Sequence, residues 1–274
     1  MKTVLVMAAA GLMFWPALDT GSSTSLASGM VAAQESGDFS WRKRMSAGQT
    51  LEIKGINGEV RAVLADGDEA EVTATKKARR SDPDDVEIKV LEHGDGVTIC
   101  AVYPTPERAR RENECVAGEG GHMNTENNDV EVTFIVKVPR GVHYTPQTVN
   151  GDVRVTGLRS NVDASTVNGS VRISTTGQAL ANTVNGSIDA SMGNADWDDD
   201  VSFSTVNGEI TLELPSEVNA ELRASTVNGD INSDFPVTVR GRFGPRRVSG
   251  TLGRGGHELE LETVNGSITL RKAP

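Results

Sequence analysis

Residues 148–153 read Thr-Val-Asn-Gly-Asp-Val, and this short stretch recurs along the second half of the chain. Val-Asn-Gly, followed by one polar residue and then Val or Ile, occurs six times, and Thr precedes the Val in every copy. An earlier variant reads Ile-Asn-Gly-Glu-Val at residues 56–60. Self-similarity of this kind predicts a repeat architecture, in which each unit buries its apolar face against the next. The six copies occupy residues 149–153, 167–171, 184–188, 206–210, 227–231 and 264–268.

The copies follow one another at a nearly regular spacing. Their asparagines, from Asn150 to Asn228, are separated by similar steps, whereas the step from Asn228 to Asn265 is much longer. The long step contains Val-Ser-Gly-Thr-Leu at residues 248–252, which keeps the motif's order of apolar, polar and glycine positions. We interpret this segment as a degenerate copy, which divides the long step into two steps of ordinary length.

The spacing and the flanking pattern predict an all-β fold. Apolar and polar residues alternate on both sides of each motif, as in residues 201–205 and 210–212, and such alternation is typical of strands. A period of roughly 20 residues suits one coil of a β-solenoid, in which short strands are joined by corners and each coil is hydrogen-bonded to the next. Because crossover connections between parallel strands are almost always right-handed, we expect a right-handed solenoid.

An antiparallel meander of β-hairpins is the alternative architecture. Asn-Gly between alternating strands is a strong hairpin signal, and Leu261 would then lie opposite Leu270. A meander gives no reason for Thr-Val to precede every Asn-Gly, however. In a solenoid the repeated Asn, Thr and Val would stack as ladders between neighbouring coils, so the repeat favours the solenoid.

The Asn-Gly pairs are predicted to be structural turns rather than binding or catalytic residues. The alternation of apolar and polar residues shifts by one position at Thr-Val. The chain must therefore turn at Asn-Gly if the apolar residues on both sides of the turn are to face the interior. Asn and Gly suit such a turn because both tolerate positive φ. The predicted turn residues are Asn57, Gly58, Asn150, Gly151, Asn168, Gly169, Asn185, Gly186, Asn207, Gly208, Asn228, Gly229, Asn265 and Gly266.

Alternating segments that lack the motif precede the repeats, and they show no helical periodicity. The open end of a solenoid exposes strand edges and apolar interior, so we expect these segments to cap it. The predicted organisation is an N-terminal β capping region at residues 34–145 and a β-repeat solenoid region at residues 146–274. The segments lie at residues 50–54, 71–76, 86–91, 97–102 and 130–138.

Residues 1–33 have the features of a secretory signal peptide. A short positive start precedes an apolar run at residues 4–18, which is shorter than the ~20 apolar residues of a membrane-spanning helix. Residues 31–33 are small enough for signal-peptidase cleavage, so the mature chain is expected to begin near Gln34. We expect an exported protein of the periplasm, the cell surface or the secreted fraction, with no transmembrane segment after signal removal.

Charge and cysteine content limit the partners. The formal net charge of −11 argues against a nucleic-acid partner, because phosphate binding needs a concentrated positive face.

After export, Cys100 and Cys115 would meet an oxidising compartment, where a pair that closes a short loop is predicted to form a disulfide. By the chain-entropy model, such a bond stabilises the fold by about 3 kcal/mol.

The leading signal, the strands before the repeats and the serial Thr-Val-Asn-Gly units together resemble a family of exported bacterial β-strand-repeat proteins of unknown function, known as putative adhesins. The resemblance spans residues 39–270. It implies a β-solenoid in the cell envelope and carries over no catalytic residues. The cysteine pair and the polar segment at residues 104–128 are not accounted for by the motif that carries the resemblance.

No catalytic, cofactor-binding or metal-binding constellation is predicted. The acidic segment at residues 196–200, which contains Trp197, is interpreted as a solvated loop; calcium binding and the acid pair of a sugar-cleaving enzyme are the alternatives. The four histidines lack neighbouring Cys or carboxylates at metal-ligand spacing and are interpreted as surface residues. They are His93, His122, His143 and His257.

We therefore interpret the chain as an exported, non-catalytic β-repeat protein that serves as an adhesin-like or structural binding module of the bacterial envelope or cell surface. Candidate partners are envelope polysaccharide and a surface or membrane protein. The alternative functions are a polysaccharide lyase or hydrolase on a β-solenoid, and a periplasmic scaffold or sensor that partners membrane signalling proteins. The polar residues that follow each Gly would form one column of the outer face: Asp152, Ser170, Ser187, Glu209, Asp230 and Ser267.

Overall fold

The computed structural model describes residues 34–118, 122–239 and 246–273. The predicted signal peptide at residues 1–33 lies outside the described residues. Nearly all regular structure in the described part is β-strand, with one short 3-10 helix, η1 (Pro83–Asp85). No helix among the described residues has the length and apolar character needed to cross a membrane.

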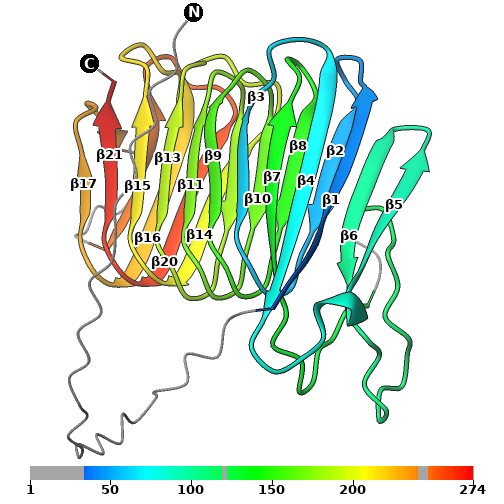
Figure 1. The fold of residues 1–274 in the computed structure, drawn as a ribbon. Coiled ribbons are helices and arrows are strands. Elements are labelled where there is room, and N and C mark those ends of the chain that lie inside the picture. Colours follow the sequence, from blue (N-terminus) through cyan, green and yellow to red (C-terminus); the bar gives the residue numbers. More distant parts are fainter. Residues whose placement is uncertain (1–33, 119–121, 240–245, 274) are drawn as a thin grey trace, which may run out of the picture. The chain divides into compact units, whose positions relative to one another are not determined.

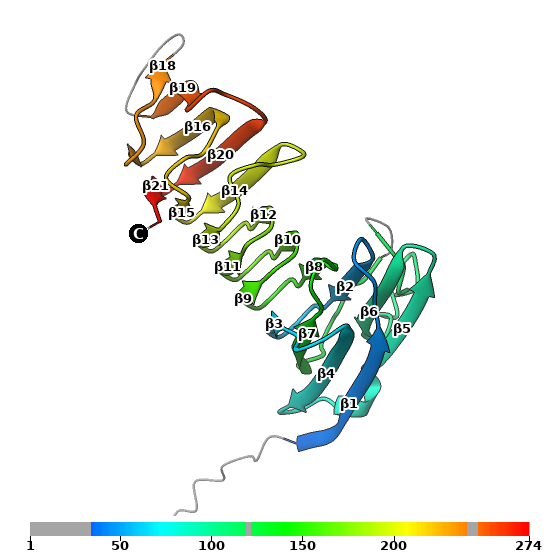
Figure 2. The same cartoon turned by 90° about the horizontal axis from the view of Figure 1, so that it is seen from above.

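The described residues form two β-sheets that lie face to face (Figures 1 and 2). In spatial order, the first sheet contains β1 (Gln34–Arg44), β4 (Glu69–Ala78), β7 (Glu131–Val138), β3 (Val60–Leu64), β9 (Val153–Leu158), β11 (Val171–Thr175), β13 (Ile188–Met192), β15 (Ile210–Leu214), β21 (Ile268–Lys272) and β17 (Ile231–Ser233). The second sheet contains β18 (Thr238–Val239), β19 (Arg247–Leu252), β16 (Ala220–Asn228), β20 (Glu258–Asn265), β14 (Val201–Asn207), β12 (Ala179–Asn182), β10 (Val162–Ser165), β8 (His143–Gln147), β2 (Thr50–Lys54), β6 (Gly96–Val102) and β5 (Glu87–His93).

Each coil of the repeat region consists of one strand from each sheet. The chain runs along a strand of the second sheet, turns at Thr-Val-Asn-Gly and enters a strand of the first sheet, as from β10 to β11 and from β12 to β13. Strands of neighbouring coils pair in parallel and in register, with Val171 opposite Ile188 and Ala164 opposite Ala181. The β-solenoid prediction is thereby confirmed.

The hairpin meander does not occur in the described part of the repeat region. The two strands that flank Asn265-Gly266 belong to different sheets, and β20 pairs with β14 and β16 rather than with β21. Leu261 and Leu270 consequently lie on different strands of different sheets and are not cross-strand partners. The same turn sequence serves both architectures, and stacking against neighbouring coils decides between them.

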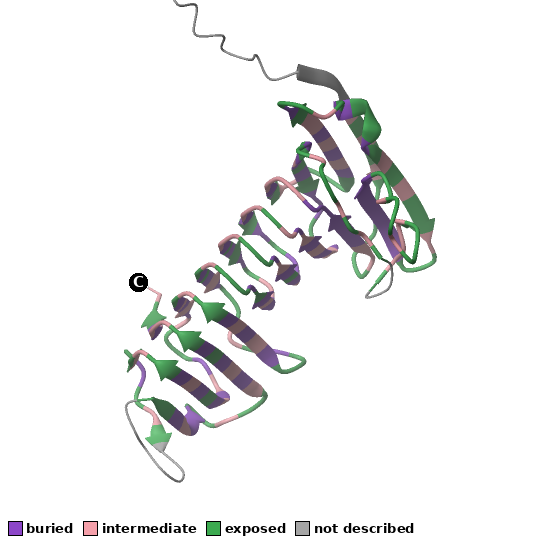
Figure 3. Ribbon diagram, turned by 90° about the horizontal axis from the view of Figure 1, so that it is seen from below, coloured by how far each residue is buried: buried purple, intermediate pink, exposed green. Residues whose placement is uncertain are grey.

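Alternation of side chains along the strands places the core between the sheets, and Figure 3 shows the resulting bands of buried and exposed residues. In β11, Val171 and Ile173 are buried, while the alternate residues Arg172 and Ser174 are exposed. The core contains residues that this alternation points inward, such as Phe203 of the second sheet. Each Å² of apolar surface removed from water stabilises the fold by about 25 cal/mol, so this layer is the main source of stability.

Glycine at each corner allows the backbones of neighbouring coils to touch. A Cβ built on Gly186 would overlap the carbonyl oxygen of Gly169, and the glycines of the other five copies stand in the same relation to a neighbouring corner. Among the predicted turn glycines, only Gly58 (φ +119°) and Gly266 (φ +158°) have positive φ, and none of the turn asparagines does. The expectation that positive φ selects Asn and Gly is therefore wrong for most corners, where close approach is the reason for glycine.

Threonine recurs because its hydroxyl bonds across the coils. In all six motifs the Thr side chain is buried, and its hydroxyl donates to the carbonyl of the corner glycine in the neighbouring coil, over 2.8–3.1 Å. Thr183, for example, donates to Gly169. The carbonyl lies beside the core, away from water, and the threonine hydroxyl supplies a hydrogen-bond donor that it would otherwise lack.

The corner asparagines form a continuous amide ladder. In the six motif copies the side-chain nitrogen of the asparagine donates to the side-chain oxygen of the asparagine in the neighbouring coil, over 2.7–2.8 Å. Asn57 is the first member, so the early variant at residues 56–60 is a full corner of the solenoid. In spatial order the ladder runs Asn57, Asn150, Asn168, Asn185, Asn207, Asn265 and Asn228.

The order of the last coils differs from the sequence prediction. Residues 248–252 are not a degenerate corner, because they belong to β19, which pairs antiparallel with β16. The short strand β18 pairs antiparallel with β19 in turn. The long step between Asn228 and Asn265 is thus an antiparallel excursion rather than two coils. The coil that follows the excursion, β20 and β21, lies between the two coils that precede it in the sequence.

Antiparallel strands occur at the other end of the stack. The pairs β1–β4, β4–β7 and β5–β6 are antiparallel, whereas β2 and β3 pair in parallel with the first repeat strands, β8 and β9. The segments predicted before the repeats correspond to β2, β4, β5, β6 and β7, while β1, β3 and β8 lie outside those segments.

The connection between β6 and β7 covers part of the outer face of the second sheet. A disulfide joins Cys100 of β6 to Cys115 in this connection, with 5.7 Å between the Cα atoms. Beneath the connection, the ammonium of Lys54 lies 3.3 Å from the carboxylate of Glu52 and donates to the carbonyl of Val116. The backbone N–H of Gly118 donates to the carboxylate of Glu52. The cover therefore buries an ion pair whose polar atoms have partners.

We predict that replacing both cysteines by serine lowers the free energy of unfolding by about 3 kcal/mol, because the crosslink restricts the unfolded chain. Chemical denaturation with and without a reductant measures this. The wild type should lose stability on reduction, and the double variant should be insensitive to the reductant. Equal stability of the two proteins under oxidising conditions would show that the disulfide does not hold the cover.

We predict that Gly186→Ala lowers the free energy of unfolding by about 1–3 kcal/mol, because the new methyl group meets the backbone of the adjacent coil. Gly67→Ala is the matched control, since a Cβ at Gly67 would meet no atom within 4 Å. The denaturation midpoints of both variants should be compared with that of the wild type. Equal midpoints for the two variants would contradict close approach as the reason for glycine.

Candidate functional site

The Thr-Val-Asn-Gly corners form one continuous edge of the stack, which we call the corner edge. It consists of the Val, the Asn and the residue after Gly in each motif. The valines point outward, with 37–55% of their surface exposed in five coils. Single exposed apolar residues are common on proteins, but a row of them in adjacent coils is not. The exposed valines, in spatial order, are Val167, Val184, Val206, Val264 and Val227.

The exposed valine column was missed by the sequence analysis, although the sequence contains a signal for it. The Thr before the Val is buried in every copy, and so is the apolar residue that ends the motif, except for the partly buried Ile231. The alternation of buried and exposed positions shifts by one residue between these two positions, and this shift leaves the Val between them exposed.

The asparagine side chains beside the valines keep hydrogen-bonding capacity toward solvent. A carboxamide has two N–H donors and an oxygen with two lone pairs, and the ladder uses one donor and one lone pair of each interior member. The side chains of Asn168, Asn185 and Asn207 are exposed. Neighbouring strands are about 4.8 Å apart, so the edge presents oriented amides at that repeat.

The predicted polar column lies on this edge, but it also has a structural role. Backbone N–H groups donate to the column side chain of the neighbouring coil: Ser170 to the carboxylate of Asp152, Ser187 to the hydroxyl of Ser170, Glu209 to that of Ser187, and Asp230 to that of Ser267. Replacement of the accepting residues Asp152, Ser170, Ser187 and Ser267 would therefore disturb coil stacking as well as the surface.

Charges are concentrated at the first coils of the edge. Arg154 lies within 3.1 Å of Glu59 and 2.9 Å of Asp152, and Arg61 within 2.6 Å of Glu59. Burial opposes ionisation of Asp152, but the N–H of Ser170 and the guanidinium of Arg154 hold its pKa below the ordinary value. The next two coils carry Ser170 and Ser187 at this position, whereas the coils of Val206 and Val227 carry the carboxylates of Glu209 and Asp230.

The acidic segment at residues 196–200 forms the loop between β13 and β14, on the side of the stack opposite the corner edge. The indole N–H of the buried Trp197 donates to the carbonyl of Asn194. The carboxylate of Asp200 accepts from the backbone N–H of Glu258 and lies 3.5 Å from the His257 ring. In the described part of the chain, no three His, Cys, Asp or Glu side chains are grouped to hold a metal ion.

The remaining predicted surface histidines do not gather with the acidic loop. His93 lies in β5, where its ring contacts the hydroxyl of Thr98 over 3.3 Å. His143 begins β8, and His122 lies in the cover between β6 and β7. His257 is the histidine that the structure brings to the acidic loop: it lies beside Asp200 and lines a pocket together with Asp196 and Trp197.

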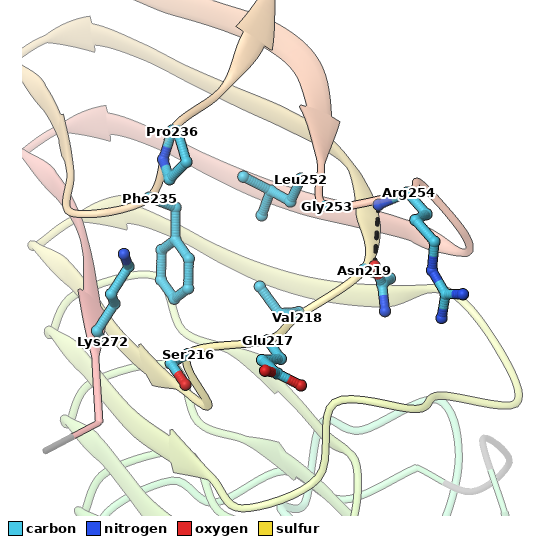
Figure 4. Close-up of a pocket in the computed structure, with 10 residues that line it drawn as sticks. All are labelled: Ser216, Glu217, Val218, Asn219, Phe235, Pro236, Leu252, Gly253, Arg254 and Lys272. Atoms are coloured by element: carbon cyan, nitrogen blue, oxygen red, sulfur yellow. Dashed lines mark hydrogen bonds between the residues drawn. The ribbon is translucent and has the colours of Figure 1, made fainter.

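A pocket of about 410 Å³ lies near the far end of the stack (Figure 4). Val218, Phe235 and Leu252 form its apolar part, and the ammonium of Lys272 lies 5.4 Å from the centre of the Phe235 ring. Arg254 lines the opposite side, where its backbone N–H donates to the side chain of Asn219. The ten lining residues include no His or Cys, and the polar side chains among them include those of Ser216, Glu217 and Lys272.

Comparison with solved structures places the fold among known proteins. A putative cell adhesion protein from Clostridium sporogenes matches with a TM-score of 0.51 at 11% identity, over 86% of this chain and 100% of that chain. A putative adhesin from Bacteroides fragilis matches with a TM-score of 0.30 at 11% identity, over 85% of this chain and 97% of that chain. No curated protein matches the chain.

The Toastrack DUF4097 family matches residues 110–271, which is more than half of the chain. The matched residues begin in the cover and end in β21, so they include all six Thr-Val-Asn-Gly corners. With its two long, mostly parallel sheets and its stacked corners, the chain belongs to the Toastrack DUF4097 family.

Proposed function

We propose that the chain is an exported, non-catalytic module of the bacterial envelope or cell surface that binds an extended partner along the corner edge. The observation that carries this proposal is the unbroken row of outward valines and oriented asparagine amides. An edge of this kind offers many equivalent weak contacts rather than one deep site. Weak contacts made in series by one polymer reinforce each other, because each contact raises the local concentration for the next.

Envelope polysaccharide is the partner class that fits the edge best. The valines supply apolar contact, and the amides supply both donors and acceptors, which is the combination that a sugar chain with hydroxyl groups and apolar ring faces can use. The carboxylates of Asp152, Glu209 and Asp230 on the edge and the net charge of −11 favour a neutral polymer over an acidic one. A surface or membrane protein is the alternative partner and is distinguished by the binding test.

Several features support a location outside the cytoplasm. The disulfide between Cys100 and Cys115 belongs in an oxidising compartment. Residues 1–33 match the composition of a secretory signal. The Clostridium sporogenes protein that shares this fold is named for cell adhesion, and that naming agrees with a role at the cell surface.

We predict that the double variant Val184→Lys and Val206→Lys loses at least tenfold in affinity for neutral cell-wall polysaccharide, because the ammonium groups remove the apolar strip. Co-sedimentation with insoluble polysaccharide measures the affinity. Thr156→Lys with Thr176→Lys is the control, since these exposed residues also lie on adjacent coils but away from the corner edge. Equal affinities of the two double variants would exclude the edge as the binding surface.

We predict that the protein carrying an epitope tag after Pro274 is recovered outside the cytoplasm when cells are fractionated. Protease treatment of intact cells then separates a surface location, where the tag is cleaved, from a periplasmic location, where it is protected until the outer envelope is opened. Recovery of the tagged chain in the cytoplasmic fraction with reduced cysteines would contradict the proposed address.

A further inference from the structure

The coil formed by β20 and β21, which we call the inserted coil, is out of sequence order in the stack. β20 lies between β14 and β16, and β21 lies between β15 and β17. Figure 1 shows the red strand β21 between β15 and β17. The two coils that flank it are consecutive in the sequence, so the inserted coil occupies a slot between them.

The two walls of the slot offer complementary groups. On one wall, Asn207 and Gly208 supply oxygens that accept from the side chains of Asn265 and Thr263. On the other wall, the side chains of Thr226 and Asn228 donate to oxygens of Gly266 and Asn265. A coil that fills the slot must therefore carry Thr, Asn and Gly in the motif order, with strands on both sides.

An empty slot would be unstable. Leu259, Leu261, Ile268 and Leu270 of the inserted coil are all fully buried, so their removal would open the core between the sheets. The slot must then close, with one wall against the other, or accept another coil of the same pattern. The walls can meet because Thr205 and Thr226 pair with the same position of the inserted coil, as do Asn207 and Asn228.

The covalent tie of the inserted coil is a glycine-rich crossover at residues 253–257. β19 pairs with one edge of β16 and β20 with the other, so the chain must cross the beginning of β16. Gly253 (φ +57°) and Gly255 (φ +79°) have positive φ. The backbone N–H of Arg254 in the crossover donates to the side chain of Asn219, just before β16, over 2.9 Å (Figure 4). The N–H of Glu221 in β16 donates to the carbonyl of His257.

We propose that the slot accepts the inserted coil of a second copy of this chain, and that reciprocal exchange joins two copies. Every contact of the slot is reproduced in the exchanged form, because the incoming coil has the same sequence. Exchange of an identical element is a low-cost route to dimers, since it changes only the hinge and the entropy of association. The crossover is that hinge, and its extension releases the positive-φ backbone at Gly253 and Gly255.

Two single-cysteine chains test the exchange. Val206 and Val264 are exposed and lie side by side, because the pairs Thr205–Thr263 and Asn207–Asn265 flank them in register. Strands about 4.8 Å apart are within the range that a disulfide spans. The Val206→Cys and Val264→Cys chains are mixed and unfolded at acidic pH without reductant, where protonated thiols leave the native disulfide intact. They are then refolded together at high concentration and oxidised.

Exchange predicts a disulfide between the two different chains. The control mixture contains Val184→Cys and Val206→Cys chains, which report edge-to-edge contact, because Val184 and Val206 lie on neighbouring coils outside the exchanged element. We expect at least tenfold more linked heterodimer in the test mixture than in the control. Equal yields, or no linked dimer in either mixture, would overturn the proposal.

A chain that carries both Val206→Cys and Val264→Cys verifies the register independently. In the monomer at low concentration these cysteines should form a bond within one chain. A failure to form this bond, together with a bond in a chain carrying Val206→Cys and Val227→Cys, would show that the walls meet directly and would also overturn the proposal. None of these outcomes depends on whether the corner edge binds polysaccharide.

Discussion

The contact between neighbouring corners is the constraint on which the whole stack depends. At each corner the absence of a Cβ lets one glycine backbone rest on the next, as Gly186 rests on Gly169. This approach brings the threonine hydroxyl to the neighbouring glycine carbonyl, and it aligns the asparagine amides into a ladder. Because all three contacts have the same register, the strands on both sides of the corner are forced to pair in parallel and without offset.

The inside and the outside of the stack follow from that register. Alternating residues of both sheets meet in an apolar core, and the valine between the buried Thr and the corner is left on the outside. The feature that stacks the coils thus also produces the repeated outer edge. The same repeated groups therefore stabilise the stack and form its outer surface. The polar column shows both roles, because the exposed side of the column also holds the coils together: the hydroxyl of Ser170 accepts from the N–H of Ser187.

Because the coils share one corner motif, their order in the stack need not follow their order in the sequence. Any coil with Thr, Asn and Gly in register can be the neighbour of any other, and the inserted coil takes a place between two coils that precede it. The antiparallel excursion through β18 and β19 supplies the length needed for this detour. Antiparallel strands at both ends of the described stack then interrupt the parallel pairing.

Local pattern in the sequence was sufficient to identify most of the strands, the corners, the parallel solenoid and the paired cysteines, because periodicity and turn residues act over a few positions. Only the tertiary structure decided which coils become neighbours, since these contacts join residues far apart, such as Asn57 with Asn150 and Asn207 with Asn265. The antiparallel pairing of residues 248–252 and the close approach that selects glycine both depend on those neighbours. A motif specifies what each coil can bond to, whereas the path of the chain between coils determines which partner it meets.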